Sequence, residues 1–142
     1  MCPNPIIKKM KSYFIDAVNH IIEPIELEAG KVLPQTYAKI GRGCNLVQIG
    51  HYLTETEVIM VDEDIYGKEN IGAFYVKGAT VLFGNAVIWN CDERGESCDC
   101  ESTMEDLLKK IFFLDTPTAN MCQERYLDNP AVKFTVLTEN EQ

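Results

Sequence analysis

Apolar and polar residues alternate from position 45 onward, and this alternation constrains the chain most because it is the pattern of half-buried β-strands. The first predicted strand covers residues 45–53, where Val47 and Ile49 alternate with Gln48 and Gly50. Turn-forming residues at 78–79 and 84–85 separate later apolar runs. We therefore expect an antiparallel meander, with further strands at 58–61, 73–76 and, as one or two strands, 80–89.

The first 22 residues instead show the period of an amphipathic helix. Asn4 and Pro5 suit the N-cap and the first helical position, and apolar residues then recur at steps of three and four. Pro24 cannot donate to a helix, so we expect the helix to end near Glu23 and to leave this carboxylate exposed at a rigid corner. A short second helix is predicted within residues 26–33, before Pro34.

The last third of the chain predicts one more helix and one more strand. Residues 102–105 read as a capping box, and an apolar stripe that includes Ile111 and Phe112 extends the predicted helix to just before Pro117. Residues 132–137 alternate like a strand, and 138–142 form a frayed acidic tail. The 142 residues are thus predicted to form a single α+β domain, an antiparallel sheet of about five strands flanked by helices.

The charge of the chain narrows the class of partner. Its 22 acidic and 13 basic residues give a net charge of −9, and the first 22 residues hold three lysines against one aspartate. This balance argues against direct binding to nucleic acid or to an anionic membrane, and it favours a basic protein partner. The chain lacks a strongly apolar span and a signal-peptide core, so we expect a cytoplasmic protein.

Three of the six cysteines, Cys91, Cys98 and Cys100, lie in an acidic segment, 91–101, that we predict to be a mobile loop. Their spacing is not that of a zinc site, so no metal is predicted and the thiols are expected to be reduced. No phosphate-binding, dinucleotide-binding, nucleophile-elbow or metalloprotease motif occurs. A Cys44–His51 pair, or an Mg²⁺ site at Asp62 and Asp64, has no supporting motif, so we expect neither an enzyme nor a cofactor.

Acidic and apolar residues are interleaved in the stretch from Glu23 to Gly41, EPIELEAGKVLPQTYAKIG. Glu23, Glu26 and Glu28 flank Ile25 on a segment stiffened by Pro24, a composition suited to a surface that meets a basic and an apolar group together. A second acidic cluster lies around the strand predicted at 58–61. This cluster could match the phosphate spacing of DNA or could protect strand edges from pairing; it consists of Glu55, Glu57, Asp62, Glu63 and Asp64.

The pattern Glu23-Pro24-Ile25, followed by acids and by Val32-Leu33-Pro34, resembles the staphylococcal uracil-DNA glycosylase inhibitor family, whose members are small acidic DNA mimics. That family has Glu-Ser-Ile and Ile-Leu-Pro at these places. Weaker similarity extends over about residues 10–127 and includes the run from Gln123 to Leu127. The chain departs from the family in Pro24, in the cysteine-rich segment and in the residues after Leu127.

The resemblance implies a stoichiometric protein inhibitor of uracil-DNA glycosylase that blocks the basic groove of the enzyme. It implies that Glu23 replaces a DNA phosphate, with Pro24, Ile25 and the acids named above around it. It also implies an apolar pocket for the leucine loop that the enzyme inserts into DNA, for which the candidate residues are Val32, Leu33, Ile40, Val58 and Met60.

Three alternatives remain at the level of the sequence. The chain could be a DNA mimic aimed at another DNA-binding protein or nuclease, since acidity alone does not select the target. It could instead be a module that binds a small cationic or nucleotide ligand, or an enzyme built on Cys91, Cys98 and Cys100.

Overall fold

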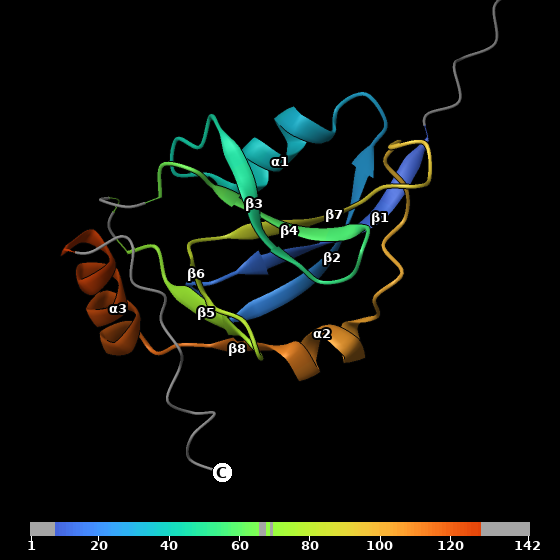
Figure 1. Cartoon of the computed structure of the whole chain (residues 1–142). Coiled ribbons are helices and arrows are strands. Elements are labelled where there is room, and N and C mark those ends of the chain that lie inside the picture. The colour runs from blue at the N-terminus through green and yellow to red at the C-terminus, as the bar shows by residue number, and fades with distance from the viewer. Residues whose placement is uncertain (1–7, 66–67, 69, 129–142) are drawn as a thin grey trace, which may run out of the picture.

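The computed structural model describes residues 8–65, 68 and 70–128, with the side chains of 125–128 left out (Figure 1). In chain order the elements are β1 (Lys9–Asp16), β2 (Ile21–Glu28), α1 (Val32–Ile40), β3 (Val47–Tyr52), β4 (Glu57–Asp62), β5 (Ala73–Val76), β6 (Val81–Phe83), β7 (Ala86–Asn90), α2 (Met104–Lys110), β8 (Ile111–Phe113) and α3 (Thr116–Asp128). The strand predicted at 132–137 and the tail 138–142 lie outside the described residues.

The fold is α+β, with antiparallel strands and one domain, as predicted. One sheet has five strands in the order β2-β1-β7-β4-β3, and the other has three in the order β6-β5-β8. The predicted meander is wrong, because β5 and β6 leave the first sheet: β5 pairs with β6 on one side and with β8 on the other. β7 then returns between β1 and β4, which makes β2 and β3 the edges of the larger sheet.

Within the described residues, a β-hairpin replaces the predicted N-terminal helix, whose predicted start at Asn4 and Pro5 lies outside them. β1 pairs with β2 along its whole length, from Lys9 opposite Glu28 to Asp16 opposite Ile21. Both faces of β1 are covered, so apolar residues occupy neighbouring positions and mimic helical steps. Asp16 forms the turn, because its Oδ1 accepts hydrogen bonds from the N–H groups of Val18 and Asn19.

Both of the other predicted helices are shifted. The helix predicted within 26–33 begins only at Val32, and Pro34 lies in its first turn, where a proline is tolerated. The capping box uses Thr103 and Asp106, one residue later than predicted, and α2 ends at Lys110. Ile111 and Phe112 belong to β8, and α3, which the sequence pattern missed, carries Pro117 in its own first turn.

The elements form layers around three apolar clusters (Figure 1). α1 covers one face of the five-stranded sheet, over Met10, Phe14 and Val87. The three-stranded sheet and α2 cover the other face, and α3 packs behind the three-stranded sheet with Leu114 and Cys122. None of the helices in the described ranges is long and apolar enough to cross a membrane.

Candidate partner-binding surface

Glu23 lies within edge strand β2, opposite Phe14, and not at the corner predicted after a helix. Its side chain is exposed and makes no ion pair or hydrogen bond with any other described residue. Pro24 is compatible with this position because an edge strand has one side on which no N–H is needed. The edge of the sheet therefore presents Glu23 as a free carboxylate.

Ile25 lies on the same face of β2 as Glu23, since side chains two residues apart on a strand point the same way. This is the face that α1 covers, and Ile25 is partly buried against the cluster of Met10 and Leu27. The ammonium of Lys39 on α1 sits 5.5 Å from the centre of the Phe14 ring. One face of the edge strand thus combines an unpaired anion with an apolar neighbour.

The other two glutamates of β2 point to the opposite face. Glu26 pairs with Lys9 at 3.8 Å, and both side chains are more than half exposed. Glu28 pairs with Lys31 at 3.5 Å. Exposed pairs of this kind contribute only about 0 to 1 kcal/mol, so a basic partner can displace them at little cost.

Glu57, predicted to bind a partner, is buried with 1% of its surface exposed. Its carboxylate accepts hydrogen bonds from the N–H groups of Glu101 and Ser102, at 2.7 and 3.0 Å, and from the Ser102 hydroxyl at 2.5 Å. Because these donors occupy the carboxylate inside the protein, Glu57 joins β4 to the start of α2. Its assignment to the partner-binding surface was wrong.

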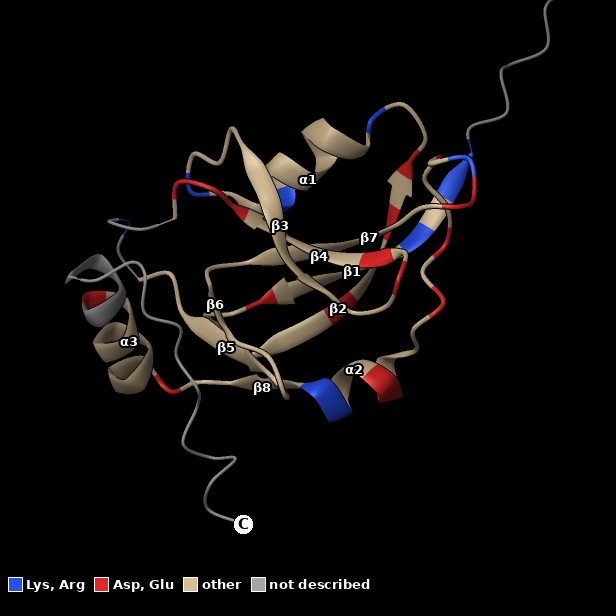
Figure 2. Ribbon diagram, viewed as in Figure 1, with Lys and Arg blue, Asp and Glu red and all other residues tan. Residues whose placement is uncertain are grey.

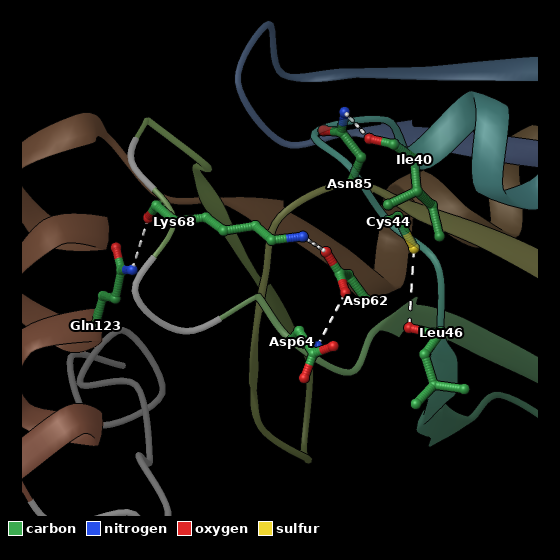
Figure 3. A network of polar contacts seen from close by, with 8 residues as sticks. All are labelled: Ile40, Cys44, Leu46, Asp62, Asp64, Lys68, Asn85 and Gln123. Carbon is green, nitrogen blue, oxygen red and sulfur yellow. Dashed lines mark hydrogen bonds and ion pairs between the residues drawn. The ribbon is translucent and has the colours of Figure 1, made fainter.

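Asp62 is also buried and was likewise wrongly assigned to the surface (Figure 3). Its Oδ2 pairs with the Lys68 ammonium at 2.6 Å, and its Oδ1 accepts the N–H of Asp64 at 2.9 Å. Gln123 on α3 donates to the Lys68 carbonyl, so the ion pair ties the loop after β4 to α3. Glu55, Glu63 and Asp64 remain exposed, at the two ends of β4.

The predicted apolar pocket divides into buried and accessible residues. Ile40 and Met60 belong to the core, with 2% and 6% exposed, so they cannot receive a partner's side chain. Val32 is half-buried beside Trp89 in a crevice of about 10 Å³. Leu33 is exposed and Val58 is half-buried.

Two exposed residues of β3 extend the accessible apolar area beyond what the sequence predicted. Ile49 pairs with Met60 and Tyr52 pairs with Val58, because a bulge at Gly50 shifts the register between them. Both therefore lie on the α1 face, with 45% and 58% exposed. On α1, Gln35 accepts the Glu28 N–H of β2 and Lys39 lies over the Phe14 ring of β1. Helical spacing places Leu33 on the opposite flank of α1. We call Leu33, Ile49, Tyr52 and Val58 the apolar surface.

The segment 91–101 fills a gap in the larger sheet. Along β1, only Phe14 and Ile15 pair with β7. Beyond them, the backbone N–H of Cys98 donates to the Asn90 carbonyl, and the backbone N–H of Cys100 donates to the Lys11 carbonyl. Asp99 accepts the Lys11 N–H, and Asp92 closes a turn by accepting from Arg94 and Glu96. These bonds favour an ordered segment over the predicted mobile one.

Two of the thiols in this segment, those of Cys98 and Cys100, are poor nucleophiles. Burial and then the nearby Glu57 carboxylate raise the pKa of Cys100 to about 12. Burial and the neighbouring acids also raise the pKa of Cys98. Cys44 packs on the α1 side, whereas His51 is opposite Ile59 on the other face, so the two do not form a catalytic pair. No three His, Cys, Asp or Glu side chains within the described ranges converge as metal ligands.

Comparison of the chain with protein-family models, with curated proteins and with solved structures found no match. The functional assignment therefore rests on the residues of this chain.

Proposed function

We propose that the protein is a stoichiometric inhibitor of uracil-DNA glycosylase that occupies the DNA-binding groove of the enzyme. One observation supports this best: Glu23 is exposed and unpaired on an edge strand, and Ile25 lies beside it on the same face. The target is chosen from the resemblance of this segment to the inhibitor family. The protein would act in the cytoplasm by binding alone, without catalysis or a cofactor.

Charge brings the partners together in this proposal. With a net charge of −9, the protein attracts a basic groove over a distance, and complementary charge raises the rate of association. Acidic segments lie along β2 and between β7 and α2 (Figure 2). Glu23 takes the place of a DNA phosphate, with Glu26 and Glu28 available once their exposed lysine partners are displaced.

The apolar surface holds the complex once it has formed. Leu33, Ile49, Tyr52 and Val58 receive the leucine loop that the glycosylase inserts into DNA. Burying one aliphatic side chain contributes about 1.5 to 3 kcal/mol and is nearly independent of salt, whereas an exposed ion pair contributes about 0 to 1 kcal/mol. The contact of apolar groups thus dominates the stability of the complex.

Replacing Glu23 tests the proposal. We expect Glu23→Lys to weaken inhibition by at least about tenfold in a uracil-excision assay, because a repulsive charge replaces the phosphate substitute. The melting temperature should not change, since Glu23 makes no contact that the fold needs. Glu124→Lys, the same charge change on exposed α3, serves as the control and should inhibit like the wild type.

Two results would contradict this proposal. Equal inhibition by the Glu23→Lys and Glu124→Lys variants would show that Glu23 has no special role. If the wild-type protein does not inhibit at equimolar concentration, the assignment to uracil-DNA glycosylase fails altogether.

A further inference from the structure

A hollow of about 210 Å³ lies where three separate segments of the chain meet: the turn between β1 and β2, residues 70–72 and the start of α3. Its floor is apolar and includes the buried residues Leu114 and Ala119. Its exposed rim carries four polar side chains, those of His20, Asn70, Thr116 and Asn120. None of these residues belongs to the acids or to the apolar surface assigned above, so the hollow is a separate feature of the molecule.

The rim offers hydrogen-bonding groups that the fold leaves unused. The side-chain amides of Asn70 and Asn120 each contain donors and an acceptor, and Thr116 has a hydroxyl. None of the four polar side chains of the rim hydrogen bonds with another residue in the described part of the chain. A ligand with its own donors and acceptors can therefore bind them without displacing a hydrogen bond within the protein.

His20 gives the hollow a flat aromatic wall. Its imidazole stacks on the Phe113 ring, with 5.2 Å between the ring centres and 7° between the ring planes. Phe113 does not line the hollow but His20 does, so the His20 side of this stack faces the open space. The Phe113 ring in turn packs edge-on against the buried Phe74 ring, which holds the stack in place. A planar ring in the hollow would extend the stack.

The backbone around the hollow is fixed before a ligand binds. Gly72 has a φ of +70° and lies so close to the β1–β2 turn that a Cβ would be 2.5 Å from the Ala17 carbonyl oxygen. His20 and Asn70 also have positive φ, 58° and 55°, which is uncommon for residues other than glycine. Such conformations persist only where the surrounding structure holds them, and they occur frequently at ligand sites.

We propose that the hollow binds one planar, uncharged nitrogen heterocycle of the pyrimidine-base kind, as a free base or a nucleoside. The ring stacks on His20, and its N–H and carbonyl groups pair with the amides of Asn70 and Asn120. The hollow has the volume of about seven water molecules at ~30 Å³ each, which suits a single ring. An anion fits less well, because the Asp115 carboxylate accepts the Thr118 N–H at 2.8 Å and already occupies the start of α3.

A titration of the protein alone tests the site and is independent of the proposed inhibition, because the glycosylase is absent. We expect thymine to cause saturable NMR shifts in the His20 ring and in the side-chain amides of Asn70 and Asn120. Dihydrothymine has the same donors and acceptors but a puckered ring, so it should bind at least about threefold more weakly. Equal binding of the two compounds, or shifts that do not saturate with thymine, would overturn the proposal.

A nucleotide separates a base site from a phosphate site. Thymidine should bind like thymine, whereas thymidine 5′-monophosphate should bind more weakly, because Asp115 and the net charge of −9 repel its phosphate. Tighter binding of the monophosphate than of thymidine would show an anion site in place of the proposed one.

The two histidines of the chain provide a matched pair of variants. His20→Asn removes the stacking ring and keeps a residue type that tolerates positive φ, so it should weaken thymine binding by at least about threefold. His51→Asn makes the same change on β3, outside the hollow, and should alter binding by less than about 1.5-fold. Equal effects of the two variants would refute the stacking role of His20.

Asn120→Ala tests the hydrogen bonds and should also weaken thymine binding by at least about threefold. Alanine is favourable inside α3, so this variant should fold. Asn45→Ala, at an exposed position that does not line the hollow, is its control and should bind thymine like the wild type. If Asn120→Ala binds thymine as tightly as Asn45→Ala, the proposed pairing with the rim is wrong.

Discussion

At the scale of single residues, Glu55 and Glu57 show how two similar acids acquire different roles. Both precede or begin β4, and composition alone assigns both to the surface. Glu55 remains exposed in the turn, whereas Glu57 points between the two sheets and accepts three hydrogen bonds. A buried carboxylate needs such donors to replace its hydration. Glu57 is therefore a structural residue.

We expect Glu57→Gln to lower the free energy of unfolding by about 1.5 to 3 kcal/mol, since a neutral amide replaces a charged acceptor and places an NH₂ group against donors. Glu55→Gln makes the same charge change two residues away and should alter it by less than about 0.5 kcal/mol. Urea unfolding of both variants measures the difference. Equal stability of the two variants would refute the structural role of Glu57.

At the scale of elements, the sequence predicted strands well where apolar residues run continuously or alternate, and it failed at the N-terminal strand. Apolar runs gave strands near β3, β4, β5 and β7, within a few residues of their observed ends. β1 lies inside the sheet and is covered on both faces, so its apolar residues mimic the spacing of a helix. Pro34 and Pro117 were read as helix ends, although a proline in the first turn is equally compatible with a helix start.

The candidate site was predictable only where exposure follows from the local sequence. Glu23 and Ile25 were recognised because a proline lies between them, and both reach the surface. Burial of Asp62 depends on Lys68, and exposure of Ile49 and Tyr52 depends on the bulge at Gly50. Such long-range pairing and register are not encoded in a short window of residues, so these assignments required the structure.

The capping box of α2 should make stability depend on pH. The Asp106 carboxylate accepts a hydrogen bond from the Thr103 N–H. This bond, followed by the interaction with the Thr103 side chain, lowers the pKa of Asp106 below its ordinary value. A carboxyl with a lowered pKa in the folded state stabilises the fold at higher pH, and this contribution is lost as the pH falls through the lowered pKa. We expect Asp106→Asn to melt below the wild type at neutral pH.

This difference in melting temperature should shrink as the medium is acidified below the ordinary aspartate pKa, because Asp106 is then protonated in the wild type as well. Thermal melts of both proteins across the acidic range provide the measurement. A difference that stays constant over that range would show that the charge of Asp106 does not contribute.

At the scale of the whole molecule, the proposed inhibitor uses different surfaces to associate with its target and to slow dissociation of the complex. Acids are distributed along β2 and the segment 91–101 (Figure 2), and the apolar surface lies on the α1 face. Salt screens exposed charges beyond about 8 Å at physiological ionic strength, but it affects apolar contacts little. The two surfaces should therefore control different rate constants for binding.

If the proposed function is correct, raising the salt concentration should slow association with uracil-DNA glycosylase and leave the dissociation rate nearly unchanged. Tyr52→Ala should do the reverse, with dissociation at least about tenfold faster, because Tyr52 is the aromatic residue of the apolar surface and its most exposed member. Surface-plasmon kinetics at graded salt separate the two effects. A dissociation rate that rises steeply with salt would assign retention to ion pairs instead.

Pro24 has one more consequence for how this protein meets other chains. A proline in the middle of an edge strand has no N–H to donate to an added strand. An extended peptide that paired with β2 could therefore not continue the β-ladder past Pro24. A partner that binds the β2 edge must therefore recognise its side chains and not its backbone. The same residue should therefore disfavour edge-to-edge pairing of β2 with a second copy of the chain.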